Sequence, residues 1–309
     1  MGGIIKKLPI PIVGLMLGLA ATGNLVLSYG DTYRNIFGCL SAILLLLVLI
    51  KIVMYPKEVK ESLDNPVVAS VFPTLSMGIM LLATYLKPYA GALAFGMWII
   101  GLILHILLMI IFSKNYLVNF NIKKVFPSWF IVYVGIAVSS ITSPAFNMTG
   151  VGQIAFWFGF ISYLVLFPIV LYRVLKVKNI PEPALPTIVI FSAPASLCLT
   201  GYMNAFQEKN MAIVYLLLAL SQATYIYILL TLPKLLKLKF YPSYSAFTFP
   251  LVISGIALKV TNGFLINAGH TIELLKYLVK LEEVVAVVMV LYVLFRYIGF
   301  LFSKEKVKG

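Results

Sequence analysis

The sequence is poor in charged residues, which make up only 11% of its 309 positions, and it contains only two cysteines and two histidines. Hydrophobic residues make up 61% of the chain, and the mean hydropathy is +1.02. Soluble domains are about half apolar and about one quarter charged. The composition therefore excludes an ordinary water-soluble protein and is typical of a chain embedded in a bilayer.

Ten stretches are apolar and long enough to cross a membrane as helices, which takes roughly 20 residues each. They cover residues 9–29, 35–55, 66–86, 91–112, 127–143, 151–172, 184–206, 211–232, 243–265 and 282–302. We therefore predict a single transmembrane domain over residues 1–309, with no separate soluble domain. The segment 266–282 is ambiguous, because it fits either an interfacial helix or the first turns of the last span.

The scarcity of cysteine and histidine argues against a catalytic or metal-binding site. Cys39 and Cys198 fall inside predicted helices, where we expect small buried hydrophobic side chains. The histidines have no Ser-His-Asp or His-rich spacing, so the sequence predicts no enzyme, no metal site and no cofactor. His105 lies in an apolar helix, and we expect it to pack there as a neutral side chain.

Acidic residues are scarce too, and all ten are predicted in loops or at helix ends. Transporters that move cations or protons usually use carboxylates buried in the membrane. Their predicted absence at mid-membrane depth argues against a cation pathway and weakens proton-coupled transport. Lys259, near the end of the ninth span, either extends its ammonium group to the membrane surface or attracts anions at a vestibule.

Basic residues alternate between the two sides of the predicted bundle. When they are sorted by connecting segment, 18 of the 24 fall on the side that holds both termini. Since positive loops stay in the cytoplasm, we predict a multi-pass protein of the cytoplasmic membrane with both termini inside. The net charge of +14 then serves mainly to orient the chain in the membrane and to contact lipid headgroups. No nucleic-acid partner is expected.

Prolines and glycines recur in pairs in the odd-numbered spans. The pairs are Pro11 and Gly18, Pro66 and Pro73, Pro127 and Gly135, Pro186 and Pro194, Pro242 and Pro250. The second member of each pair lies about two turns into its helix, where it bends or weakens it. The carbonyls freed by a bend cannot face lipid. We therefore predict five helical hairpins, with kinked odd helices around a central pore and unbroken even helices outside them.

Such a pore suits an anion. Its predicted lining is Gly, Ala, Ser, Thr and aromatic side chains, with no acid. Phe249 directly precedes Pro250, and a ring at a bend of a pore-facing helix is placed to plug a narrow channel. The alternative for Phe249 is ordinary packing among the 21 phenylalanines of the chain.

Several segments resemble the tellurite-resistance/dicarboxylate transporter family. They are GLMLGLAATGN (14–24), NPVVASVFPTLSMG (65–78), FPSWFIVYVGIAVSS (126–140), FPIVLYR (167–173), ALPTIVIFSAPASLCLTGY (184–202) and AFTFPLVISGIAL (246–258). The resemblance implies an all-α integral membrane fold of ten transmembrane helices, arranged as five hairpins with quasi-fivefold symmetry around a central pore. It also implies a homotrimer with one pore per protomer, and a phenylalanine that closes the pore, which falls on Phe249 with Phe247 as the reserve.

Two mechanisms stay open. In the favoured one the chain is a passive, phenylalanine-gated channel for small anions such as chloride or nitrate. In the alternative it is a secondary carrier for a dicarboxylate, sulfite or tellurite-type oxyanion, with its binding groups at the broken helices. The absence of a mid-membrane acid to carry a coupling proton favours the channel. A non-conducting scaffold is disfavoured by the five matched helix breakers.

Overall fold

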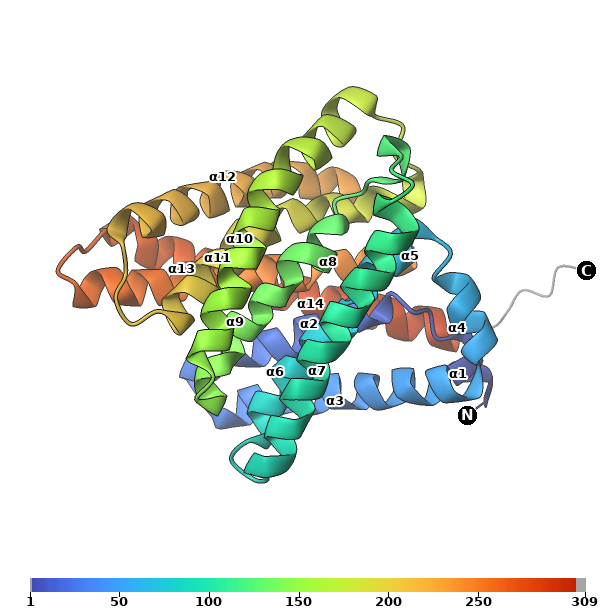
Figure 1. Ribbon diagram of the computed structural model, residues 1–309, viewed down its shortest axis with the longest axis horizontal. Helices are drawn as coiled ribbons and strands as arrows, with labels where there is room; N and C mark the ends of the chain where they lie inside the picture. Colours follow the sequence, from blue (N-terminus) through green and yellow to red (C-terminus); the bar gives the residue numbers. More distant parts are fainter. Residues whose placement is uncertain (1, 304–309) are drawn as a thin grey trace, which may run out of the picture.

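The structure, a computed structural model, describes residues 2–303, and all the regular elements in this range are helices (Figure 1). Nine helical segments in this range are long and apolar enough to span a membrane, and the shorter apolar helix α2 (Ile12–Leu25) makes a tenth. The prediction of an all-helical membrane protein with ten apolar spans is confirmed. Three basic residues of the C-terminal tail (Lys304, Lys306 and Lys308) and Glu305 lie outside the described residues.

Five long helices form the outside of the bundle. They are α3 (Asp31–Met54), α7 (Gly91–Phe112), α10 (Thr149–Tyr172), α12 (Met211–Leu235) and α14 (Glu273–Phe302). Only 22% to 39% of their most apolar 18 residues are buried, against 61% to 89% in four of the alternate segments. Large apolar side chains point outward from each of them, for example Val53, Ile110, Ile154, Leu230 and Phe295. An apolar outer surface of this kind is stable only in contact with lipid.

The other five segments form the inside of the bundle. They are α2; α5 (Pro66–Val71) with α6 (Thr74–Leu86); α8 (Trp129–Val134), η4 (Gly135–Ala137), α9 (Val138–Thr142) and η5 (Ser143–Phe146); η7 (Glu182–Ser192) with α11 (Ala193–Ala205); and η8 (Pro242–Phe247) with α13 (Phe249–Asn267). Along the chain α2, α6, α9, α11 and α13 each contact the next, and α13 contacts α2. The inner segments therefore close into a ring. Their quasi-fivefold symmetry stays a prediction.

Four inner segments are interrupted where a proline or glycine was singled out. The α-helix breaks at Pro73 between α5 and α6 and at Gly135 between α8 and α9. Pro194 and Pro250 lie in the first turns of α11 and α13, each preceded by a 3₁₀ segment. At Gly18 there is no interruption, because α2 is continuous from Ile12 to Leu25, and the bend expected there stays a prediction. Gly18 instead allows close packing: an added Cβ would lie 2.6 Å from the Thr248 side chain.

Short elements precede the first span or connect the spans. They are α1 (Gly2–Lys7), η1 (Leu27–Tyr29), α4 (Pro56–Ser62), η2 (Ser113–Leu117), η3 (Ile122–Lys124) and η6 (Arg173–Val177). The Lys7 ammonium donates a 2.7 Å hydrogen bond to the carbonyl of Ser303, so α1 and the last turn of α14 lie together, at the right of Figure 1. We call this the terminus end of the bundle, and the other the opposite end.

The last helix begins earlier than predicted. Because α13 ends at Asn267 and α14 begins at Glu273, most of the ambiguous segment forms the first turns of the last span. This places Glu282 and Glu283 well inside α14, where they are only 1% and 3% exposed. The expectation that every acidic residue lies in a loop or at a helix end is therefore wrong for these two residues.

The two cysteines differ from each other. Cys198 is fully buried in α11, as expected. Cys39 lies in α3 but is exposed on the outer surface of the bundle, so the expectation that it is buried is wrong. The physical reason is that α3 is apolar on all sides and packs inward with only a narrow face, which the sequence pattern does not identify.

Candidate functional site

Three cavities follow one another along the axis of the inner ring, and each is lined by residues in, or just before, all five inner segments. The cavity at the terminus end is lined by Pro11, Pro66, Phe126, Pro183 and Pro242, among others. The middle cavity is lined by Gly14, Thr74, Val134, Pro194 and Phe249, among others. The cavity at the opposite end is lined by Asn24, Thr84, Thr142, Asn204 and Val260, among others. In every segment the residue numbers rise from the cavity at the terminus end to the cavity at the opposite end. The five segments therefore run in the same direction along one axis.

The pathway formed by these cavities narrows in the middle. The cavity volumes are about 360 Å³ at the terminus end, about 30 Å³ in the middle and about 280 Å³ at the opposite end. A water molecule takes up roughly 30 Å³ of liquid volume. The middle cavity is thus too small for a hydrated ion, and the pathway is closed there.

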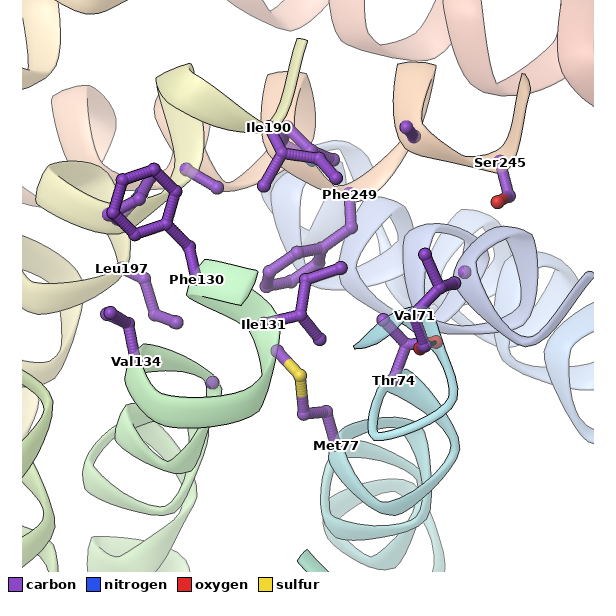
Figure 2. A pocket seen from close by; sticks show the side chains of 16 residues that line it. Val71, Thr74, Met77, Phe130, Ile131, Val134, Ile190, Leu197, Ser245 and Phe249 are labelled. Carbon is purple, nitrogen blue, oxygen red and sulfur yellow. Dashed lines mark hydrogen bonds between the residues drawn. The ribbon is translucent and has the colours of Figure 1, made fainter. Parts of the chain in front are cut away.

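Phe249 lies at this narrow point. It lines both the middle and the opposite cavity, and its side chain is 6% exposed. Figure 2 shows its ring in the centre of the middle cavity, beside Ile131 and facing Met77. Phe247, two residues earlier, is fully buried against Tyr244 with ring centroids 4.8 Å apart, and it lines none of the three cavities.

Hydroxyl groups next to the interruptions donate hydrogen bonds to nearby backbone carbonyls. Ser76 donates to the carbonyl of Pro73 at 2.7 Å, and Thr74 donates to that of Val71 at 2.8 Å. At the start of α11, Ser196 donates to the carbonyl of Ser192 at 2.7 Å. Freed backbone carbonyls at membrane depth must be satisfied within the protein. These hydroxyls therefore allow the inner segments to be irregular without exposing unpaired groups to lipid.

The predicted kink residues differ in their relation to the pathway. Gly135, Pro194 and Pro250 line the middle cavity, whereas Gly18 and Pro73 do not. Gly18 instead meets Thr248, the residue that joins η8 to α13 and directly precedes Phe249. Glycine at position 18 thus positions the start of the helix that carries the narrow point.

The lining of the pathway is uncharged. No residue that lines the three cavities, all within the described part of the chain, carries a formal charge. Lys259 is not among them: its ammonium contacts a Glu283 carboxylate oxygen at 2.8 Å and donates to the carbonyl of Leu25 at 2.7 Å. Lys259 thus forms an ion pair between α13 and α14, and its role at a vestibule stays a prediction.

His105 joins two inner segments from the outer helix α7. It is fully buried, with Nδ1 2.9 Å from the Ser76 hydroxyl and Nε2 3.2 Å from the carbonyl oxygen of Val132. It also fills the space beside Gly135, where an added Cβ would lie 3.0 Å from its ring. His105 thus packs as expected and, in addition, satisfies a carbonyl just before the break at Gly135.

We expect His105→Ala to lower the free energy of unfolding by roughly 1–3 kcal/mol, because it leaves the buried Val132 carbonyl without a donor. Thermal unfolding of the purified protein in detergent measures this. His270→Ala is the matched control, since His270 is exposed and its removal should change the unfolding temperature little. Equal unfolding temperatures for the two variants would contradict this role of His105.

Sequence reasoning missed Glu282. Both of its carboxyl oxygens are buried and have no hydrogen-bond partner among the described residues. The neighbouring Glu283 is different, because Lys259, Lys280 and the Tyr29 hydroxyl all contact its carboxylate. The signal in the sequence was the pair of acids inside the apolar run from Leu274 to Phe302, which a helix starting at residue 273 would have placed in the membrane.

The fold and the site together define a polytopic helical membrane protein with an uncharged pathway along the axis of its inner ring. A model of the family described as "Voltage-dependent anion channel" (SLAC1) matches residues 7–298. The chain therefore belongs to this family of anion channels and transporters, and the resemblance to the tellurite-resistance/dicarboxylate transporter family is confirmed.

One curated relative matches part of the chain. It is described as an uncharacterized transporter of Methanocaldococcus jannaschii and is 27% identical over 186 residues, which cover 56% of this chain and 54% of the relative. The match thus spans about half the length of that relative.

Proposed function

We propose that this protein is a passive channel for small anions in the cytoplasmic membrane, closed by the ring of Phe249. The observation that carries the proposal is that this ring separates two wider cavities at the narrowest point of the axis. An apolar constriction of this size excludes a hydrated ion by dewetting, without a dedicated binding site. When the ring moves aside, small monovalent anions such as chloride or nitrate pass down their gradient.

The charge distribution supports an anion as the permeant species. The three cavities have no carboxylate in their lining, and the amide groups of Asn24 and Asn204 keep an N–H donor for an anion at the opposite end. Basic residues crowd the terminus end, in line with both termini in the cytoplasm. The homotrimer implied by the family resemblance is part of this proposal, and chemical cross-linking in the membrane tests it.

A second candidate is a secondary carrier for a dicarboxylate, sulfite or tellurite-type oxyanion. The specific observation that favours it is the buried carboxyl group of Glu282, since proton-coupled carriers use membrane-embedded acids. This removes the argument against a carrier that rested on the expected absence of such an acid. Glu282 does not line the pathway, however, so the passive channel remains the better supported function.

Flux measurements on the purified protein in liposomes distinguish the two functions. For the channel we expect chloride or nitrate flux that follows the anion gradient, needs no pH gradient and rises with concentration without saturation. Liposomes without protein give the background. Uptake of malate or sulfite that saturates and requires a pH gradient, with no flux of chloride or nitrate, would replace the channel by the carrier.

A further inference from the structure

The Glu282 carboxyl group is buried deep in the membrane part of the bundle. It lies nine residues after the start of α14 and 20 before its end, which at 1.5 Å per residue is about 14 Å and 30 Å. Its backbone packs against Gly255 of α13. Gly255 is six residues beyond Phe249, or about 9 Å along the helix. When α14 is centred on a hydrocarbon core of about 30 Å, this position lies inside the core.

Polar groups from α12 face this carboxyl group. The Gln222 side chain lies within hydrogen-bonding reach of Glu282, and the Tyr225 hydroxyl interacts with it electrostatically. The amide nitrogen of Gln222, the hydroxyl of Tyr225 and the two carboxyl oxygens are all buried, and none of them makes a hydrogen bond of normal distance and angle among the described residues. Since buried polar groups are nearly always paired, four such atoms beside one another indicate a site that binds something small.

Glu282 forms no ion pair with any of the basic residues that the structure describes. Lys259 and Lys280 contact the neighbouring Glu283 instead, at 2.8 Å and 3.2 Å. Tyr225 is the titratable group that faces Glu282 from α12, and α2, which also packs against α14, contributes none between Ile12 and Leu25. Tyr244 of η8 contacts α14 ten residues further along, at Tyr292. An unpaired carboxylate in such surroundings is far more costly than a neutral carboxylic acid.

We propose that Glu282 is a proton-binding site inside the membrane, and that its carboxyl group holds a proton while α12, α13 and α14 are packed as in this structure. The carboxylate takes up the proton from water to become the neutral acid, and no other bond changes. The neutral acid can donate to the Tyr225 hydroxyl or the Gln222 amide oxygen and can accept from the Gln222 amide nitrogen. Loss of the proton requires that water or a cation reach the carboxylate.

The site lies behind the helix that carries Phe249. In α13, Phe249, Ile253, Ile256 and Val260 follow one another at helical spacing and line the opposite cavity. Gly255 lies on the other face of the same helix, against Glu282. A charge that appears at Glu282 therefore changes the packing of α13 from behind, so anion flux depends on pH through this residue. This consequence rests on the proposed anion pathway, whereas the proton site itself does not.

Infrared spectroscopy tests the proton site without any transport assay. Of the other described carboxylates, all but Glu58 and Glu283 are exposed, and these two are ion-paired with Lys51 and Lys259. We expect the wild-type protein, in a detergent without carbonyl groups, to show the C=O stretching band of a protonated carboxyl near neutral pH. Glu282→Gln should remove this band, and Glu273→Gln, a change of an exposed carboxylate in the same helix, should keep it. A wild-type spectrum without the band, or a band that Glu282→Gln retains, overturns the proposal.

Flux in liposomes tests the consequence for transport. We expect anion flux of the wild-type protein to change with pH, and the Glu282→Gln variant, whose side chain is always neutral, to lose most of this dependence. A pH profile that is the same in both proteins overturns the link to the helix of Phe249. If neither protein conducts while the infrared band behaves as expected, the proposed channel fails and the proton site stands.

Discussion

Replacement of Phe249 by alanine is expected to raise the anion flux at least tenfold over the wild-type protein. The ring lines the middle cavity, where only about 30 Å³ is free, and we expect its removal to join the two wider cavities into one water-filled path. A barrier lowered by only about 1.4 kcal/mol gives a tenfold rate. The measurement is chloride or nitrate current in planar bilayers, with equal amounts of wild-type and variant protein.

Phe247→Ala is the matched control for this experiment. The change is chemically identical and lies two residues away, but Phe247 packs against Tyr244 and lines none of the three cavities. We therefore expect no rise in current, although the lost packing lowers stability by roughly 3–5 kcal/mol. A rise for Phe247→Ala with none for Phe249→Ala would move the gate to the reserve position. Silence of both variants, with both proteins folded, would remove the phenylalanine gate.

The breaks in the inner segments could be predicted from the sequence because proline acts locally. Pro73, Pro194 and Pro250 each interrupt or begin an α-helix, since proline lacks the N–H that the helix needs. A glycine by itself does not interrupt a helix in this way. Gly135 lies at a break, whereas Gly18 lies in a continuous helix because its missing side chain makes room for Thr248, 230 residues away in the sequence. No local pattern shows such a contact.

For the charged residues, too, local sequence patterns did not predict the surroundings found in the structure. The hydropathy of the last span predicted a start at residue 282, since the charges between Glu273 and Glu283 lower the local average. In the structure, α14 begins nine residues earlier, and Glu283 within it is paired with Lys259 of α13. Contacts between helices determine whether Lys259, Glu282 and Glu283 are paired or unpaired. These contacts cannot be inferred from the sequence of one helix alone.

Gly18→Ala is expected to lower the free energy of unfolding by about 1–3 kcal/mol, the usual cost of overpacking a tight core. The added Cβ would lie 2.6 Å from Cβ and Oγ1 of Thr248 and 3.1 Å from the backbone nitrogen of Phe249. Threonine is short and branched at Cβ, so it has no flexible end that can move away. The start of α13 must shift instead. Thermal unfolding in detergent measures the loss.

Two further variants isolate this contact. Gly96→Ala is the control, because nothing lies within 4 Å of its added Cβ, and alanine at this α7 position should leave stability equal or slightly higher. Thr248→Gly removes the side chain that Gly18→Ala would meet. We expect the double variant to lose less stability than the sum of the two single losses, because the clash is gone. Strict additivity would mean that residues 18 and 248 do not meet, and that the start of the helix carrying Phe249 is positioned by other contacts.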